Sequence, residues 1–323
     1  MGESEDVHGQ RTPDEDPAGT VWVPGGTFLM GSEEFYPEER PVRRSSVEGF
    51  WMDARPVTTE QFGRFVRTTG YVTLAERPLD PALYPGAQPD LLVPGSAVFV
   101  PTAGPVDLDD NRNWWAYLPG ASWRHPSGPG STIDGLDHHP VVHVAFEDAA
   151  AYAAWAGRDL PTEDEWERAA RGGLEGARFA WGDEDFPGGR AMANTWQGEF
   201  PWQNLELDGY ARTSPVGTFP ANGYGLYDMT GNVWEWTTTP YAVAVTPTRQ
   251  ARACCAPIAA PEVSGAVESD GVDGIPRRVI KGGSHLCAPN YCLRYRPAAR
   301  QPQTVDTSTS HMGFRCVVRP APV

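Results

Sequence analysis

The chain has 323 residues and a net charge of −16 at pH 7, which disfavours nucleic acid and anionic membranes as partners. Its 35 glycines and 32 prolines indicate a loop-rich backbone, while 12 tryptophans, 11 tyrosines and 12 phenylalanines argue against a disordered chain. We expect a single domain over 19–323, because no linker separates two cores. The acidic residues 1–18 are predicted to form a disordered tail.

The first predicted elements are strands. Alternating apolar residues around a Pro-Gly-Gly turn predict a β-hairpin over 21–32, and a further strand is expected over 49–56. Thr58 and Gln61 have the spacing of a capping box, which predicts that a helix begins there.

The middle of the chain alternates between irregular and ordered segments. Residues 74–137 are rich in proline and glycine and show little periodicity. A strand over 139–146 and a helix over 147–156 are predicted next. Thr162 and Glu165 form a second capping box, which predicts another helix that ends at a Gly-Gly pair.

The block 242–275 is rich in alanine, valine and proline, which is typical of a surface insertion. It carries the vicinal pair Cys254 and Cys255, for which an incidental surface pair and a redox or metal-transfer pair are both open interpretations. The chain has five cysteines, an odd number, and neither a signal peptide nor a membrane-spanning stretch is visible. We therefore expect a protein of the reducing cytoplasm with functional thiols.

Cys287 and Cys292 lie five residues apart in a segment rich in tyrosine and arginine, which includes Tyr291, Arg294 and Arg296. Cationic neighbours favour the thiolate, which is both the nucleophile and the metal ligand. A structural disulfide is disfavoured by the expected compartment, whereas a redox dithiol and a two-thiolate site for a soft ion such as Cu(I) remain open. We expect this site to lie in a surface cleft.

Other catalytic signatures, such as a phosphate-binding loop or a zinc-protease helix, are not visible. Lys281 is the single lysine in the chain, which makes lysine-based chemistry an unexpected mechanism. Two segments, 194–210 and 228–235, place side-chain oxygens near glycine turns. Such loops suit Ca²⁺, although ordinary turns and caps have the same composition.

Six motifs occur in an order that resembles the sulfatase-modifying-factor domain over residues 20–319. They are VPGGTFLMGS (23–32), DLPTEDEWE (159–167), ANGYGLY (221–227), GNVWEW (231–236), KGGS (281–284) and GFR (313–315). The pair Cys287 and Cys292, in SHLC (284–287) and YCLRYR (291–296), narrows the resemblance to the formylglycine-generating enzymes.

This resemblance implies a single α/β domain with little regular secondary structure, related to C-type lectins. It implies an oxidase that uses O₂ and Cu(I) to convert the cysteine of a Cys-x-Pro-x-Arg segment to Cα-formylglycine. The partner would be an unfolded sulfatase polypeptide, with no nucleic acid or membrane involved, and a monomer is the default expectation.

The resemblance also assigns roles to residues. Cys287 and Cys292 would bind Cu(I), Ser284 and Tyr291 would line the pocket, and Trp234 would lie close to it. Two structural Ca²⁺ sites are implied: Asn194, Thr195, Asp208 and Tyr210 at the first, and Asp228, Gly231, Val233 and Glu235 at the second.

Three positions depart from the family pattern. Ala288 stands where many members have a histidine after the first cysteine, and Asp228 replaces a common asparagine. Cys316 matches a disulfide-bonded cysteine of secreted relatives, but the partner position is Ala153, so a reduced thiol is expected.

Two alternatives to the oxidase are a catalytically silent sulfatase-binding relative and an iron-dependent enzyme that forms sulfur–carbon bonds.

Overall fold

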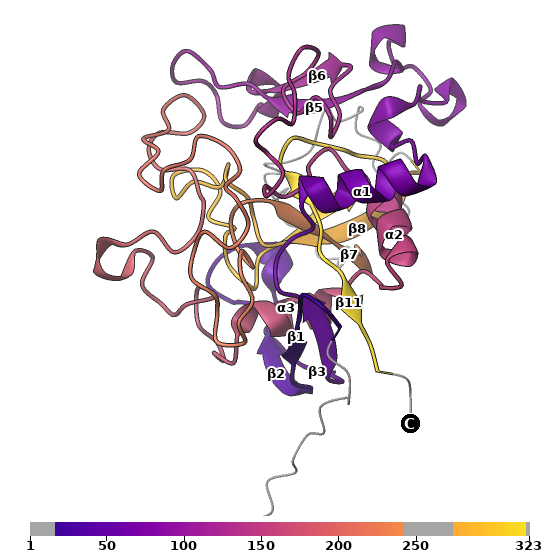
Figure 1. The fold of residues 1–323 in the computed structure, drawn as a ribbon. Helices are drawn as coiled ribbons and strands as arrows, with labels where there is room; N and C mark the ends of the chain where they lie inside the picture. Colours follow the sequence, from indigo (N-terminus) through magenta and orange to yellow (C-terminus); the bar gives the residue numbers. More distant parts are fainter. Residues whose placement is uncertain (1–16, 242–273, 321–323) are drawn as a thin grey trace, which may run out of the picture.

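The computed structural model describes residues 17–241 and 274–320. The predicted acidic tail therefore lies almost wholly outside the described residues, as do nearly all of the predicted insertion and the Cys254–Cys255 pair. The described chain combines three α-helices with short strands and long irregular connections, which confirms the predicted mixed α/β fold with little regular secondary structure (Figure 1).

The strands are β1 (Thr20–Val23), β2 (Gly26–Met30), β3 (Arg43–Val47), β4 (Phe50–Asp53), β5 (Gly95–Phe99), β6 (Trp115–Pro119), β7 (Trp234–Pro240), β8 (Arg277–Lys281), β9 (Arg300–Thr304), β10 (Met312–Gly313) and β11 (Val317–Val318). The α-helices are α1 (Thr59–Thr69), α2 (Phe146–Trp155) and α3 (Glu163–Arg171). Short 3-10 helices are η1 (Pro37–Glu39), η2 (Leu74–Glu76), η3 (Pro81–Leu83), η4 (Pro89–Leu91), η5 (Asn111–Asn113) and η6 (Pro187–Gly189).

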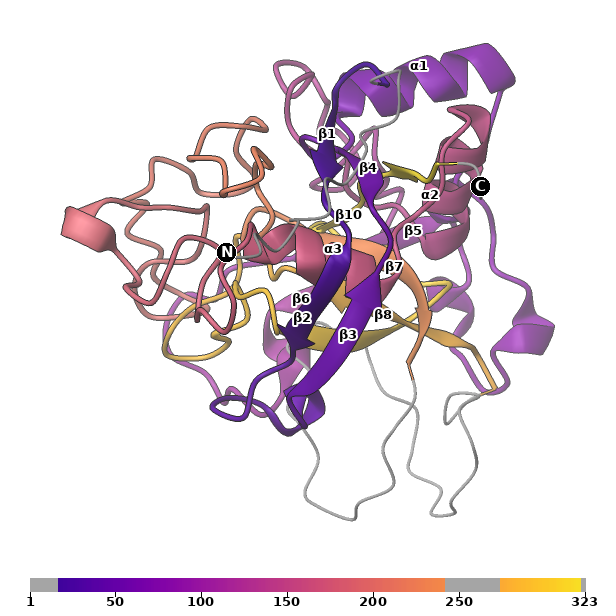
Figure 2. The ribbon, with the colours of Figure 1, turned by 90° about the horizontal axis from the view of Figure 1, so that it is seen from below.

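The largest sheet has the order β10-β7-β8-β9, with β10 parallel to β7 and the other pairs antiparallel. A second sheet has the order β1-β4-β11, and β2-β3 and β5-β6 form separate pairs. Figure 1 shows β7 and β8 near the centre, β5 and β6 at one end and β1 to β3 at the other. In Figure 2, β2 and β3 cross in front of α3, which contacts both this pair and the central sheet.

The predicted hairpin over 21–32 is wrong. β1 pairs with β4, with Trp22 opposite Trp51, whereas β2 pairs with β3. Gly25 explains the difference, because a Cβ there would lie 2.6 Å from the backbone nitrogen of Gly49. The Pro-Gly-Gly segment therefore carries the chain closely past the β3–β4 connection from one sheet to another, instead of reversing it.

The helix predictions are confirmed at their capping residues. Thr58 and Gln61 bond reciprocally at the start of α1, as do Thr162 and Glu165 at the start of α3. α3 ends at Gly172, whose φ of 57° is the left-handed conformation that glycine adopts without strain. α2 begins one residue earlier than predicted.

The predicted strand over 139–146 is also wrong. Its backbone bonds to separate segments, with Val141 donating to Val57 and His143 to Thr309, and His143 has a φ of 60°. A ladder cannot continue through such a residue. The alternating apolar pattern instead reflects a loop that buries Val141 and Val144 in the core.

Candidate functional site

Cys287 and Cys292 are brought together as the sequence predicts. Their Sγ atoms lie 3.4 Å apart, far beyond the length of about 2.05 Å of a disulfide bond, so both are reduced thiols. A turn in which the Cys292 N–H donates to the Ala288 carbonyl (2.7 Å) brings them face to face. The expectation of a surface cleft is wrong, because each cysteine is only 1% exposed and belongs to the main core cluster.

The loop that precedes the thiols is formed by two glycines. Gly282 and Gly283 have φ values of 94° and 69°, and a Cβ at Gly283 would lie 2.7 Å from the carbonyl oxygen of Arg294. This close passage places the Ser284 backbone nitrogen 3.4 Å from the Cys287 sulfur, while the backbone N–H of Cys287 donates to the Ser284 carbonyl. A donor aimed at sulfur favours the thiolate form.

Arg294 supplies the predicted positive charge. Its Nη1 lies 3.8 Å from the Cys292 sulfur, its Nη2 lies 2.6 Å from Glu38, and its guanidinium stacks 3.7 Å from the Tyr36 ring centroid. Arg296 was also expected to act as a cationic neighbour of the thiols. Its guanidinium instead forms a bidentate ion pair with Glu39, at 2.9 and 2.5 Å. The segment around η1 therefore clamps the chain that follows the thiols.

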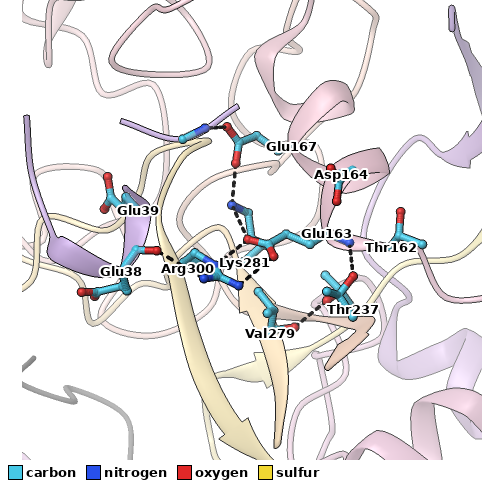
Figure 3. A network of polar contacts seen from close by, with 12 residues as sticks. Glu38, Glu39, Thr162, Glu163, Asp164, Glu167, Thr237, Val279, Lys281 and Arg300 are labelled. Carbon is cyan, nitrogen blue, oxygen red and sulfur yellow. Dashed lines mark hydrogen bonds and ion pairs between the residues drawn. The ribbon is translucent and has the colours of Figure 1, made fainter. Parts of the chain in front are cut away.

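Lys281 fixes the chain that precedes the thiols. The side chain is fully buried at the end of β8, with Nζ 2.8 Å from Glu167 and 3.7 Å from Glu163, both on α3 (Figure 3). Arg300 of β9 bonds Glu163 (2.7 Å), and Arg171 bonds Glu167 (2.7 Å). Although burial raises the pKa of Glu167, Lys281 and Arg171 outweigh it and hold that pKa below its ordinary value. The single lysine is thus a structural anchor next to the site.

A small pocket opens beside Cys287 and is walled mainly by aromatic rings. Tyr291 stacks on Phe200 with ring centroids 4.6 Å apart, and the Trp114 ring meets Tyr291 edge-on at 5.4 Å. The lining residues are Trp114, Trp115, Phe200, Ser284, Leu286, Cys287, Tyr291 and His311. Such walls exclude water while leaving few polar groups to meet a ligand.

Ser284 and Tyr291 both lie in the lining of this pocket. Trp234 is fully buried in the core cluster that contains both cysteines but is not one of the lining residues. No sequence pattern assigned Phe200 or His311 to the site. The adjacent tryptophans Trp114 and Trp115 stood out within an irregular segment, but nothing in the sequence connected them to residues 284–292.

The first predicted calcium loop is centred on Asp208. Its carboxylate accepts from the backbone N–H groups of Thr195 and Tyr210, each at 3.0 Å. The Gln197 amide nitrogen donates to both the Asp208 carboxylate (2.8 Å) and the Thr195 hydroxyl (3.2 Å). Asn194 is buried, and its side-chain oxygen has no hydrogen-bond partner in the part of the chain that the structure describes. This surplus of oxygen acceptors fits a hard cation.

In the second predicted calcium loop, the carboxylates accept hydrogen bonds from donors within the chain. Both oxygens of Glu235 accept from Arg315, and one also accepts from Trp166 Nε1 (2.7 Å). Asp228 accepts from the Gly217 N–H (2.6 Å), and burial, strengthened by the Glu235 charge, raises its pKa to about 6. The positive charges of Arg315 and Arg55 both act to lower the Asp228 pKa, so arginines of the chain already oppose the two carboxylates of this loop.

The two predicted calcium loops contact one another and the loop that precedes the thiols. Gly231 packs against the Asn194 carbonyl, and its N–H donates to Gly282 (2.9 Å), while Val233 beside it is buried. Within 17–241 and 274–320, no cluster of three or more His, Cys, Asp or Glu side chains is placed to hold a metal ion. The predicted sites instead depend on two thiols, or on amide and carbonyl oxygens beside carboxylates.

Comparisons with known proteins agree with this fold. The family model described as "Sulfatase-modifying factor enzyme 1-like domain" matches residues 5–320. The formylglycine-generating enzyme of Mycobacterium tuberculosis is 57% identical over 300 residues, which cover 93% of this chain and 97% of that protein. The formylglycine-generating enzyme of Thermomonospora curvata is 45% identical, with 96% and 97% covered.

A relative from Mus musculus, named inactive C-alpha-formylglycine-generating enzyme 2, is 39% identical, with 94% of this chain and 86% of that protein covered. Among solved structures, PvdO from Pseudomonas aeruginosa aligns with a TM-score of 0.57 at 22% identity, covering 92% of this chain and 93% of that one, which supports the fold alone. The chain therefore belongs to the formylglycine-generating enzyme family of sulfatase-modifying factors. In the described part of the chain, none of the helices has the length and apolar character needed to cross a bilayer.

Proposed function

We propose that this protein is an oxidase that converts the cysteine of a Cys-x-Pro-x-Arg segment in an unfolded sulfatase to Cα-formylglycine, with O₂ as the acceptor. The observation that carries the proposal is the pair of reduced thiols, 3.4 Å apart, beside an aromatic-walled pocket. The family membership and the names of the relatives support it.

The donor set at the pocket fits Cu(I). Two adjacent thiolates are the soft ligands that this ion prefers, and Cys287 and Cys292 would hold it. Bound copper would supply the one-electron chemistry through which O₂ reacts with a closed-shell thiol. The Ser284 N–H at Cys287 and Arg294 at Cys292 would offset the negative charge of the two thiolates.

The remaining pocket residues prepare the reaction without transferring electrons. The rings of Trp114, Phe200 and Tyr291 exclude water and give a rigid wall for the substrate side chain.

In each turnover O₂ would accept four electrons, two from the CH₂–SH group and two from a thiol reductant. The products would be the aldehyde, hydrogen sulfide, water and the disulfide of the reductant.

We further propose that Ca²⁺ binds the first loop through Asn194, Thr195, Asp208 and Tyr210, and the second through Asp228, Gly231, Val233 and Glu235. The unpartnered Asn194 oxygen supports the first site most directly. A cytoplasmic monomer remains our proposal for location and assembly. The charge of −16 suits a substrate segment that carries arginine.

The experiment is a mass-spectrometric assay with Cu(I), reductant, O₂ and the peptide Leu-Cys-Thr-Pro-Ser-Arg. Conversion lowers the peptide mass by about 18 Da, because H₂S is lost and one oxygen is gained. The same peptide with alanine in place of cysteine is the control. If copper and peptide bind but the mass is unchanged, the protein resembles the inactive relatives in function and the oxidase proposal is wrong.

A further inference from the structure

His311 is the one imidazole in the lining of the pocket beside the thiols. It is 1% exposed, and the Trp115 ring meets its own edge-on at 4.8 Å. Its carbonyl accepts the Trp234 N–H (2.9 Å), just before β10 joins β7. The residue is therefore held by both backbone and ring contacts, and its ring cannot turn freely.

The two ring nitrogens of His311 have different surroundings. Nδ1 lies 3.1 Å from the Ser284 hydroxyl oxygen, which also accepts the Leu286 N–H at 3.2 Å. Nε2 is buried and has no hydrogen-bond partner among residues 17–241 and 274–320. Buried polar atoms normally have a hydrogen-bond partner. A buried nitrogen without one in a pocket wall therefore indicates that a ligand in the pocket forms this hydrogen bond.

The ring is neutral at physiological pH. Burial lowers the pKa of His311 well below its ordinary value, and the nearby His285 and His143 lower it further. A neutral imidazole carries one N–H and one lone pair, and a hydroxyl can donate or accept. In either tautomer, the bonded Ser284–His311 pair therefore offers one donor and one acceptor.

We propose that Ser284 and His311 form a charge-neutral proton relay, in which Nε2 of His311 meets the thiol of the substrate peptide. When Nε2 takes the S–H proton, Nδ1 passes its proton to Ser284, and the serine hydroxyl gives its own proton to an oxygen-derived acceptor in the pocket. No atom of the pair gains net charge, which suits a buried site where an isolated charge is costly. The relay rests on the proposed oxidase function and adds a residue to it.

A second buried pair provides a matched control. His143 Nδ1 lies 2.7 Å from the Ser96 hydroxyl, in the same arrangement as His311 and Ser284. However, its Nε2 lies 2.9 Å from the Pro126 carbonyl oxygen, so both nitrogens are satisfied. His143 is not part of the pocket lining, and its pKa is lowered to about 4 by burial. His143 and Ser96 therefore reproduce the geometry of His311 and Ser284, but His143 does not reach the pocket in which a ligand would bind.

The first test compares kinetics. His311→Asn retains an acceptor for Ser284 but cannot relay a proton, so kcat should fall by roughly 10²- to 10³-fold, with KM for the peptide changed less than about threefold. His143→Asn, which tolerates the positive φ, should leave kcat within about twofold. A kcat for His311→Asn within about threefold of wild type would overturn the relay.

The second test needs no metal and no turnover. In ¹⁵N-labelled copper-free protein under argon, the Cys peptide should shift the Nε2 resonance of His311, while the Ala peptide should not, and His143 should respond to neither. Ser284→Ala should shift the Nδ1 resonance of His311 alone. A protonated His311 at pH 7, or an Nε2 resonance insensitive to the Cys peptide, would overturn the relay. If the Nε2 resonance responds to the Cys peptide but the separate copper assay with O₂ gives no aldehyde, the oxidase is rejected and the relay with it, and only the contact between Nε2 and the peptide thiol stands.

Discussion

The thiol loop, residues 281–296, and the two predicted calcium loops, residues 194–210 and 228–235, lie in contact but are stabilised in different ways. Each end of the thiol loop is held by buried ion pairs within the chain: Lys281 with Glu167 before the thiols, and Arg294 with Glu38 after them. The first of the other two loops instead contains the Asn194 oxygen, which has no hydrogen-bond partner in the described chain, and the second gathers two buried carboxylates, Asp228 and Glu235.

This difference indicates which part of the molecule is organised by its own side chains. Opposite charges that lie together in a buried region satisfy one another and give a single geometry, so the thiols are positioned before any ligand binds. Loops with surplus oxygens gain stability when a cation binds, and Gly231 transmits their position to Gly282 next to the thiols. The following predictions test this contrast, beginning with the largest effect.

Cys292→Ser should lower kcat/KM by more than about 100-fold. Loss of a residue that only supports a metal ligand costs roughly 10- to 100-fold, and Cys292 is proposed to be a ligand itself. A hard hydroxyl replaces a soft thiolate, so Cu(I) affinity should fall in parallel, as measured by competition with a chromophoric chelator. Cys316→Ser is the control, because it replaces a buried thiol outside the pocket lining. Retained copper-dependent aldehyde formation in Cys292→Ser would reject the assignment.

Lys281→Met should lower the free energy of unfolding by roughly 3 kcal/mol, because it leaves buried Glu167 and Glu163 without their shared ammonium. Urea denaturation measures the change. Arg112→Ala, which breaks an exposed pair with Asp110, should leave the curve in place. A loss below about 1 kcal/mol for Lys281→Met would show that Arg171 and Arg300 alone compensate the two carboxylates.

Asp148 tests whether hydrogen bonds from neutral donors can stabilise a buried carboxylate as well as a positively charged partner does. Its carboxylate accepts from Ala145, Leu74 and Tyr71, yet burial raises its pKa to about 6. Because the folded-state pKa exceeds the unfolded value, its contribution to stability is present below about pH 4 and is lost as pH rises through 6.

Relative to Asp148→Asn, wild type should therefore lose roughly 3 kcal/mol of unfolding free energy between pH 4 and pH 7. Denaturation of both proteins across this range gives the difference directly, and other titrating groups cancel. Parallel stability profiles would mean that the three donors compensate the ionised carboxylate fully.

Calcium should give the smallest effect. At about 30-fold excess over its dissociation constant, a cation that binds one loop adds about 2 kcal/mol, so EDTA should lower the thermal midpoint. Asn194→Ala should weaken this response, whereas the exposed Asn113→Ala should preserve it. An EDTA-insensitive midpoint in wild type would remove both calcium assignments.

Several features were predictable because they depend on short segments. Each capping box at α1 and α3 joins residues three positions apart, and the five-residue spacing of Cys287 and Cys292 was enough to bring the sulfurs together. The motifs also identified Ser284 and Tyr291, which the structure places in the pocket. Local hydrogen bonds and short loops depend little on the rest of the fold.

Only the tertiary structure decided which distant residues meet. The partners of β1 and β2, the clamp of Glu38 on Arg294 and the contact of His311 with Ser284 join segments far apart in the sequence. An alternating apolar pattern indicates burial but does not specify a pairing partner, which is why the strand over 139–146 was predicted incorrectly. The sequence by itself therefore determined the thiols and the helix ends, and packing decided the pocket around them.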